Sequence, residues 1–172
     1  KKLVDYGAKG LMVKLTQSTD YVNPLATTQI ANGKTAGLDL VGCYHYFMGD
    51  GTAEGQAFLA QLEAFNISKT SIVALAITDG ALNPTASGAT LTKAELNTQI
   101  HKCYAVLDEA GYVNTCDYAS ETEFGNWFDS VSKYKWIISL SENQRPSLAD
   151  AWQYETNFKD TNVHGNYGYE NI

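Results

Sequence analysis

The chain has 172 residues, of which 44% are hydrophobic and 18% are charged, and its formal net charge at pH 7 is −7. That length suffices for one sizeable hydrophobic core, so we expect a single domain over residues 1–172. No run approaches the ~18 apolar residues of a membrane span. A single arginine, Arg145, argues against a surface that follows nucleic-acid phosphates, and the charge favours a neutral or cationic partner.

The aromatic residues and the cysteines further limit the range of possible functions. Eleven Tyr, six Phe and three Trp are many for a chain with so few charges. Most aromatic residues fill cores, but this balance also suits stacking on neutral ligands such as sugars. Cys43, Cys103 and Cys116 leave at least one thiol unpaired and match no zinc-binding spacing. We expect neither a metal nor a cofactor.

Short apolar runs alternate with helical patterns, which is typical of repeated strand–helix units around a parallel sheet. A shorter helix is predicted over 122–132, and after residue 141 short strands follow with little helical pattern between them. Residues 83–90 are predicted as a loop after the third strand, on the side where a parallel barrel carries its chemistry. The predicted strands cover residues 10–16, 38–47, 71–78, 112–119, 135–141 and 150–155.

The longer helices carry recognisable ends. Asn23 and Pro24 are predicted to open the first helix as N-cap and first helical residue, and Gly37 to close it. Thr92 and Glu95 have the spacing of a capping box at the start of the third. The second and third helices each carry an apolar stripe at helical spacing, formed by Phe58, Leu59, Leu62 and Phe65 and by Leu96, Ile100, Cys103 and Leu107.

Four segments in the same order resemble the glycoside hydrolase family 25 lysozymes. They are VKLTQSTDYVNP (13–24), AGLDLVGCYHYF (36–47), ALAITDG (74–80) and AWQYE (151–155). The resemblance implies an α/β fold, a single TIM-barrel-like flattened (β/α) barrel with fewer than eight helices. It also implies that the N-terminal strand of the family is absent, because the segment 1–10 is similar only to the helix that follows it. A protein partner or an additional chain segment is therefore expected to complete the barrel.

The catalytic acids of the family do not appear at the matching positions. Glycosidases need two carboxyl groups, and the family carries them as Asp-x-Glu at a strand end, where a spacing of two puts both on one face. The resemblance places Ala76 and Thr78 there, and Gly168 or Tyr169 at a further family acid near the C-terminus. Asp79 is a weak remnant candidate, because one residue out of register it faces the other way. No catalytic residue is therefore predicted.

The sugar-holding part of the family groove is retained. Aromatic faces cover the C–H surface of a sugar ring, while hydroxyl and imidazole groups bond its hydroxyls. The alternative is that the same side chains are kept for packing inside the barrel. The predicted substrate-binding residues are Tyr44, His45, Tyr46, Tyr118, Trp152 and Tyr154.

Three functions fit these observations. The first is a catalytically inactive muramidase-like domain that binds bacterial peptidoglycan or a related glycan, or serves as an interaction module. The second is an active lysozyme that hydrolyses the β-1,4 glycan of peptidoglycan with non-standard acids such as Asp79, Glu155 or Glu170. The third is a vestigial structural domain of a phage or surface assembly. Loss of a whole set of acids favours the first, in an extracellular, cell-wall-associated or phage-encoded protein.

Overall fold

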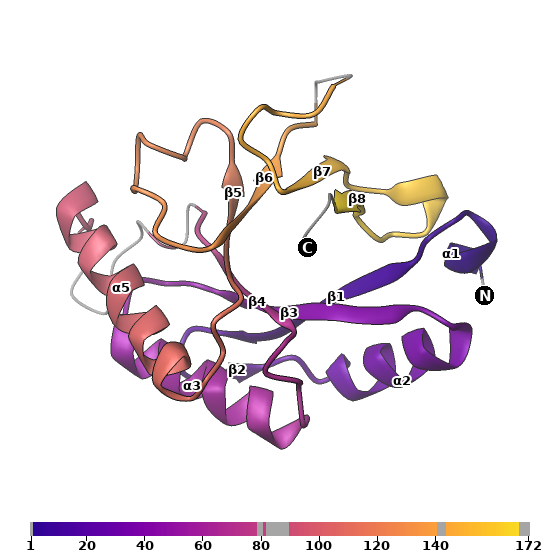
Figure 1. Cartoon of the computed structure of the whole chain (residues 1–172), viewed down its shortest axis with the longest axis horizontal. Helices are drawn as coiled ribbons and strands as arrows, with labels where there is room; N and C mark the ends of the chain where they lie inside the picture. Colours follow the sequence, from indigo (N-terminus) through magenta and orange to yellow (C-terminus); the bar gives the residue numbers. More distant parts are fainter. Residues whose placement is uncertain (1, 79–80, 82–89, 141–143, 169–172) are drawn as a thin grey trace.

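One sheet of eight strands, curled into an open half-barrel, forms the frame of the molecule (Figure 1). The computed structural model describes residues 2–78, 81, 90–140 and 144–168. The sheet order is β2-β1-β3-β4-β5-β6-β7-β8, with parallel neighbours except for the antiparallel edge strands β2 and β8. The strands are β1 (Gly10–Gln17), β2 (Tyr21–Val22), β3 (Asp39–Tyr46), β4 (Ile72–Ala76), β5 (Thr115–Ser120), β6 (Tyr134–Ile138), β7 (Ala151–Glu155) and β8 (Gly165–Gly168).

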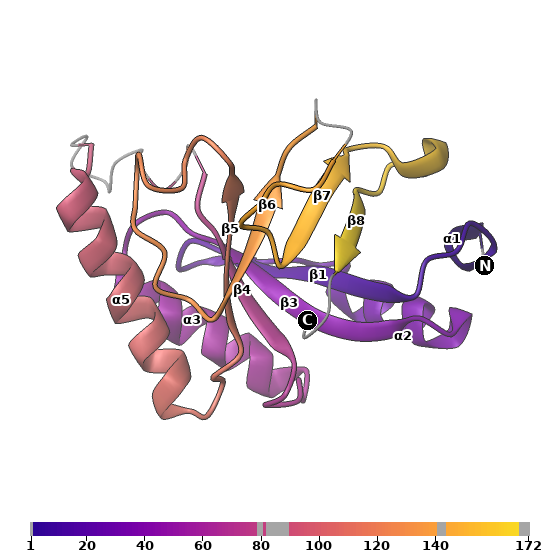
Figure 2. The ribbon, with the colours of Figure 1, turned by 45° about the horizontal axis from the view of Figure 1, so that its top comes forward.

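Helices cover only one part of this sheet. Figure 2 shows α2, α3 and α5 gathered on the outer side of the first strands, whereas β6, β7 and β8 are joined by loops. None of the helices in the described part of the chain combines the length and apolar character that a membrane crossing needs. The helices are α1 (Lys2–Asp5), α2 (Ala26–Ala36), α3 (Gly51–Ala64) and α5 (Lys93–Glu109), with a 3-10 turn η1 (Phe158–Asp160).

The predicted fold class and the order of strands are confirmed. The strand predicted over 112–119 begins later, at Thr115, because Tyr112 takes part in the turn that follows α5. Its backbone N–H donates to the carbonyl of Leu107, and Gly111 adopts the left-handed φ of 88° that such a helix end requires. Tyr112, the first residue of the predicted strand, is therefore used to end the helix.

Alternate residues along the strands pack into two different hydrophobic clusters, one on each face of the sheet. Outward-facing residues such as Val13, Cys43, Val73 and Leu75 pack against the helices in the main core. Inward-facing residues form a second cluster in the hollow of the half-barrel, made of Ile72, Ala74, Ala76, Cys116, Tyr118, Trp136 and Ala151. This second face is where side chains from different strands meet without helices between them.

The helix ends agree with the sequence at two of the three predicted caps. The capping box of Thr92 and Glu95 is formed at the start of α5, and Gly37 ends α2 with φ 86°. The start of α2 differs, because Leu25 and not Asn23 is the N-cap. The Asn23 side chain instead accepts from the Leu25 N–H at 3.0 Å and donates to the Lys14 carbonyl at 2.7 Å, which fastens the turn to β1.

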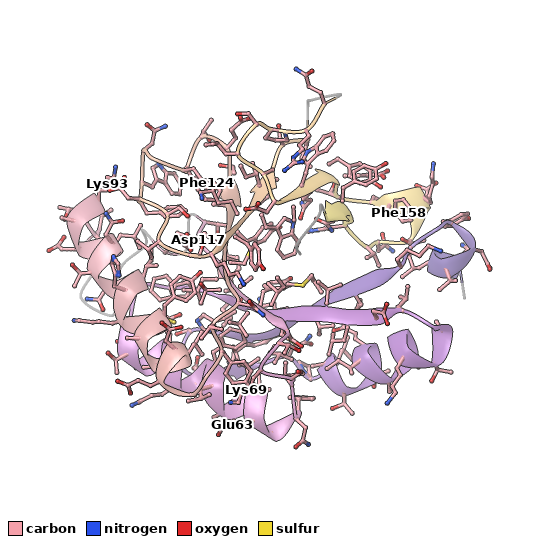
Figure 3. All side chains as sticks on the ribbon, viewed as in Figure 1. Glu63, Lys69, Lys93, Asp117, Phe124 and Phe158 are labelled. Carbon is pink, nitrogen blue, oxygen red and sulfur yellow. The ribbon has the colours of Figure 1, made fainter. Side chains whose placement is uncertain are left out.

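The helix predicted over 122–132 is not formed. The segment folds as turns, with a bridge between Phe124 and Phe128 (Phe124 is labelled in Figure 3). Gly125 adopts φ 79°, which an α-helix does not allow, and Phe128 is fully buried with its ring centroid 5.1 Å from that of Phe124. Of the predicted loop at 83–90, only Thr90 lies within the described residues, and Asp79, Tyr169 and Glu170 lie outside them.

Candidate functional site

The hollow of the half-barrel contains a cavity of about 1140 Å³. It extends along the inner face of the sheet, from the edge of β1 to the edge of β8. Both edge regions contribute lining residues, because the sheet is curled but not closed. The lining residues used below are Lys14, Tyr44, Tyr118, Trp136, Tyr154, Glu155, His164 and Asn166.

Three aromatic rings from different strands meet on the floor of this cavity. Tyr118 and Trp136 are stacked, with ring centroids 4.0 Å apart and an interplanar angle of 30°. The ring of Tyr44 lies 6.0 Å from Tyr118 and 6.1 Å from Trp136. Tyr44 on β3 can reach its partners across β4 because the inward residues of β4 next to it, Ala74 and Ala76, are small. The result is an aromatic surface with rings in several orientations.

Polar groups hold these rings to the far edge of the sheet. The Tyr118 hydroxyl donates to Gln153 Oε1 at 2.6 Å, and His164 Nδ1 lies 3.0 Å from the same oxygen. Trp136 Nε1 donates to Asn166 Oδ1 at 2.8 Å. Burial raises the pKa of Tyr118, so its hydroxyl stays protonated and remains a donor. The aromatic floor is therefore fixed by β7 and β8 before any ligand arrives.

The positions that the resemblance assigns to the catalytic acids lie at the carboxyl end of β4. Ala76 is inward-facing, fully buried and in register with Tyr46 and Tyr118. Thr78 follows the strand, and its Oγ1 donates to the Tyr46 hydroxyl oxygen at 2.5 Å. At the two positions that the resemblance assigns to the catalytic acids, the chain thus presents a methyl group and a hydroxyl group.

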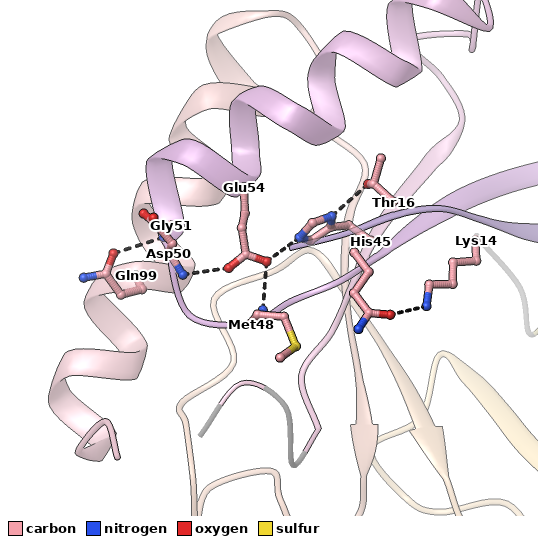
Figure 4. A network of polar contacts seen from close by, with 9 residues as sticks. Lys14, Thr16, His45, Met48, Asp50, Gly51, Glu54 and Gln99 are labelled. Carbon is pink, nitrogen blue, oxygen red and sulfur yellow. Dashed lines mark hydrogen bonds and ion pairs between the residues drawn. The ribbon is translucent and has the colours of Figure 1, made fainter. Parts of the chain in front are cut away.

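His45 lies on the opposite face of the sheet from the cavity, which corrects its expected place in the groove. It is fully buried against Phe58 of α3, with ring centroids 5.5 Å apart. Its Nδ1 is 2.8 Å from Thr16 Oγ1, and its Nε2 is 2.7 Å from Glu54 Oε2 (Figure 4). Glu54 also accepts the backbone N–H groups of Met48 and Asp50, so this network orders the turn between β3 and α3.

Trp152 is also turned away from the aromatic floor. It is in register with Ile137, packs with that residue and Ala149, and donates through Nε1 to the Ser139 carbonyl at 2.9 Å. Tyr154 shares this outer side, where its ring stacks on Tyr167 at 4.8 Å, and it reaches the cavity only at the β8 rim. Of the six expected groove residues, Tyr44, Tyr46 and Tyr118 belong to the inner-face cluster.

The structure adds residues that the sequence reasoning did not single out. Trp136 and Gln153 complete the floor, and the alternation of KWIIS on a predicted strand was the available signal for Trp136. Glu123 is a buried carboxylate beyond the end of β5, and it accepts from the Ser120 N–H at 2.5 Å. Asp117 is also buried but faces outward, where it accepts from Tyr104 and Ser130 at 2.7 Å each.

Comparison with known proteins identifies the fold family. The model of glycosyl hydrolases family 25 matches residues 1–163. The chain belongs to this family. No curated protein sequence matches this family 25 chain.

Solved structures share the family 25 fold with this chain. A muramidase from Trichobolus zukalii superposes with a TM-score of 0.75 at 14% identity, covering 99% of this chain and 86% of its own. A family GH25 lysozyme from Aspergillus fumigatus has a TM-score of 0.75 at 18% identity, covering 95% and 82%. The modular autolysin LytC from Streptococcus pneumoniae, in complex with a synthetic peptidoglycan ligand, has a TM-score of 0.72 at 13% identity, covering 91% of this chain and 38% of its own.

Proposed function

We propose that this family 25 chain binds bacterial cell-wall glycan without cleaving it. The proposal depends on two features that occur together: Ala76 and Thr78 at the end of β4, and the aromatic floor beside them. The two positions that resemble the catalytic pair lack ionisable groups, while Tyr44, Tyr118 and Trp136 line a cavity of about 1140 Å³. On this proposal the catalytic carboxyl groups have been lost at one end of the hollow, and an aromatic surface suited to sugars has been kept beside it.

Hydrolysis of a glycosidic bond needs a proton donor and a second carboxylate on the other side of the bond. Thr78 cannot protonate a leaving oxygen at neutral pH, and its hydroxyl hydrogen is used by Tyr46. Ala76 offers neither a proton nor a lone pair. A bound glycan at this end of β4 would therefore meet groups that can hold it in place but cannot cut it.

Binding of a glycan does not need the two carboxyl groups that its hydrolysis needs. The faces of Tyr44 and Trp136 can cover the apolar side of a sugar ring, and the amide and imidazole groups of the β7–β8 rim can bond its hydroxyls. The structural likeness to LytC, which has been solved with a synthetic peptidoglycan ligand, supports the choice of peptidoglycan as the glycan. An extracellular, cell-wall-associated or phage-encoded protein follows from that choice.

An active lysozyme with non-standard acids is the second candidate. Glu123 favours it, because this carboxylate is only 8% exposed and is close enough to Tyr118 to help raise the pKa of that phenol, after burial and the charge of Tyr44. Glu155 is another acid that lines the cavity. Glu123 already serves the turn after β5 through the Ser120 N–H, which supports a structural role for it.

We also propose that the half-barrel is completed by an additional chain segment or a protein partner. Both Gly10–Val13 of β1 and the strand β8 border the same cavity, and the sheet ends at β2 and β8. A strand placed there would pair with edges that otherwise offer free backbone groups. A sedimentation assay of the pure chain against the chain co-expressed with its natural neighbours would reveal such a partner.

Sedimentation with insoluble peptidoglycan, combined with muropeptide release from the same walls, tests the function. We expect the chain to be retained and no muropeptide to be released. Release by the unmodified chain would establish the active alternative, and Glu123→Gln would then report whether that acid takes part. No retention and no release would leave only the vestigial structural domain.

A further inference from the structure

Lys14 contributes a cationic side chain to the lining of the cavity. It lies on the inner side of β1, in register with Tyr44 of β3, so its side chain enters the hollow beside the aromatic floor. Its ammonium donates to Gln17 Oε1 at 2.6 Å (Figure 4) and lies 5.1 Å from the ring centroid of Tyr21 and 5.0 Å from that of Tyr46. These contacts fix the position of the charge but do not neutralise it.

The ammonium has no counter-ion within the described part of the chain. Lys93 forms an ion pair with Asp129, and the imidazole of His45 lies against Glu54. Among the described residues no carboxylate lies within 4.0 Å of the Lys14 ammonium. Burial lowers the pKa of Lys14, in agreement with a charge that has lost part of its water. An ammonium has three N–H donors, and Gln17 uses one of them. Two donors therefore remain for a ligand.

The charges that line the cavity favour an anion. Three lysines line the cavity, Lys9, Lys14 and Lys159, against one described carboxylate, Glu155. This local balance is opposite in sign to the net charge of −7 for the whole chain. The overall charge predicted a neutral or cationic partner, but a ligand inside the cavity experiences the charges that line it.

A second donor points to the same place. Because Thr78 Oγ1 donates to the Tyr46 hydroxyl oxygen, the hydroxyl hydrogen of Tyr46 is left to donate elsewhere. Tyr46 also lies under the Lys14 ammonium. An ammonium and a phenol hydroxyl from adjacent strands are thus available to one anionic group, next to the rings that would receive a sugar.

We propose that Lys14 determines specificity by binding a carboxylate carried by the glycan, so that the chain selects acidic glycans over neutral ones of the same length. The proposal rests on the glycan-binding function above. In peptidoglycan such a group is the lactyl carboxylate of muramyl residues whose stem peptide has been removed, because the peptide is otherwise joined to it through an amide bond, whereas chitin oligosaccharides have no carboxylate. Charge-assisted hydrogen bonds to a partly buried ammonium are among the stronger polar contacts, and we expect about a tenfold preference.

The test compares two soluble tetrasaccharides by titration calorimetry at low salt. One is a peptidoglycan tetrasaccharide with free lactyl carboxylates, and the other is the same compound with those carboxylates reduced to alcohols. We expect the unmodified chain to bind the acid form about tenfold more tightly, and added salt to weaken only that form. Lys14→Met should abolish the preference while leaving the affinity for the reduced form unchanged, and Lys14→Arg should keep part of it.

Two further variants separate a ligand contact from a structural effect. Gln17→Glu places a carboxylate on the side chain that already bonds Lys14, so it should compete with the ligand and remove the preference without loss of folding. Lys34→Met removes an exposed lysine of α2 and should change nothing. Equal affinity of the unmodified chain for both forms, or a preference that survives Lys14→Met, would overturn the role of Lys14 and leave glycan binding intact. Binding of neither form would overturn both proposals.

Discussion

Tyr118 and Trp136 lie face to face on the neighbouring strands β5 and β6, with ring centroids 4.0 Å apart. Their polar ends are tied to Gln153 and Asn166, on the two strands that close the other side of the hollow. One stacked pair thereby joins four strands and presents its remaining ring surface to the cavity. The same contacts that stabilise the half-barrel create the surface that we assign to the glycan.

The two tryptophans of the late strands should behave differently in a binding assay. Trp136→Ala removes a ring from the cavity floor and should weaken retention on peptidoglycan by about 1–3 kcal/mol. Trp152→Ala removes a ring that packs on the outer side, so it should lower stability but leave retention of the folded fraction unchanged. Sedimentation with cell walls, alongside thermal denaturation, distinguishes the two effects. Equal loss of retention in both variants would contradict the assignment of faces.

Restoring the acids of the family should not restore the enzyme. Ala76→Asp with Thr78→Glu supplies the resembling pair, yet the resemblance places Gly168 or Tyr169 at the further family acid near the C-terminus. Residues that act as a unit do not contribute additively. Ala76 is fully buried between Tyr46 and Tyr118 on neighbouring strands, so a carboxylate there should cost stability on the order of several kcal/mol. Muropeptide release and urea unfolding of the double variant measure both outcomes. Robust release would show that the remaining site is intact.

The buried pair of His45 and Glu54 should matter for folding and not for the ligand. Glu54→Ala leaves the imidazole and the N–H groups of Met48 and Asp50 without an acceptor, so we expect a loss of about 3–5 kcal/mol in the free energy of unfolding. Glu54→Gln keeps an acceptor oxygen and should cost less. Urea unfolding gives these values, and retention on cell walls should be unaffected in the folded protein. A specific loss of retention in Glu54→Gln would place the network in the binding machinery.

Alkaline pH should destabilise the chain partly through Cys43. Burial raises the pKa of this thiol from 9.0 to about 12, so in the folded state it stays neutral where the unfolded chain ionises. The contribution to stability is therefore complete below pH 9 and is lost as the pH rises toward 12. Cys43→Ala should show a shallower fall in stability between pH 9 and pH 10 than the unmodified chain, by up to about 1.4 kcal/mol. Parallel pH profiles for the two chains in urea unfolding would exclude this cause.

Local patterns in the sequence determined much of the fold. The capping box of Thr92 and Glu95 and the stop at Gly37 depend only on neighbouring residues, and both are formed as predicted. The order of strands and helices, and with it the fold class, follows from periodicity and from the family resemblance. The turn at 122–132 was mistaken for a helix because its apolar spacing is helical, whereas the left-handed Gly125 and the burial of Phe128 depend on tertiary contacts.

The sequence determined which residues of a strand share one face of the sheet, but not which of the two faces lines the hollow. Alternation already requires that His45 point away from Tyr44 and Tyr46, and that Gln153 point away from Trp152. Which set faces the hollow depends on what covers the other side: α3 with Phe58 and Glu54 takes His45, and Ile137 with Ala149 takes Trp152. The isolated charge of Lys14 likewise belongs to the tertiary structure alone, because the absence of a counter-ion among the described residues depends on how distant strands come together.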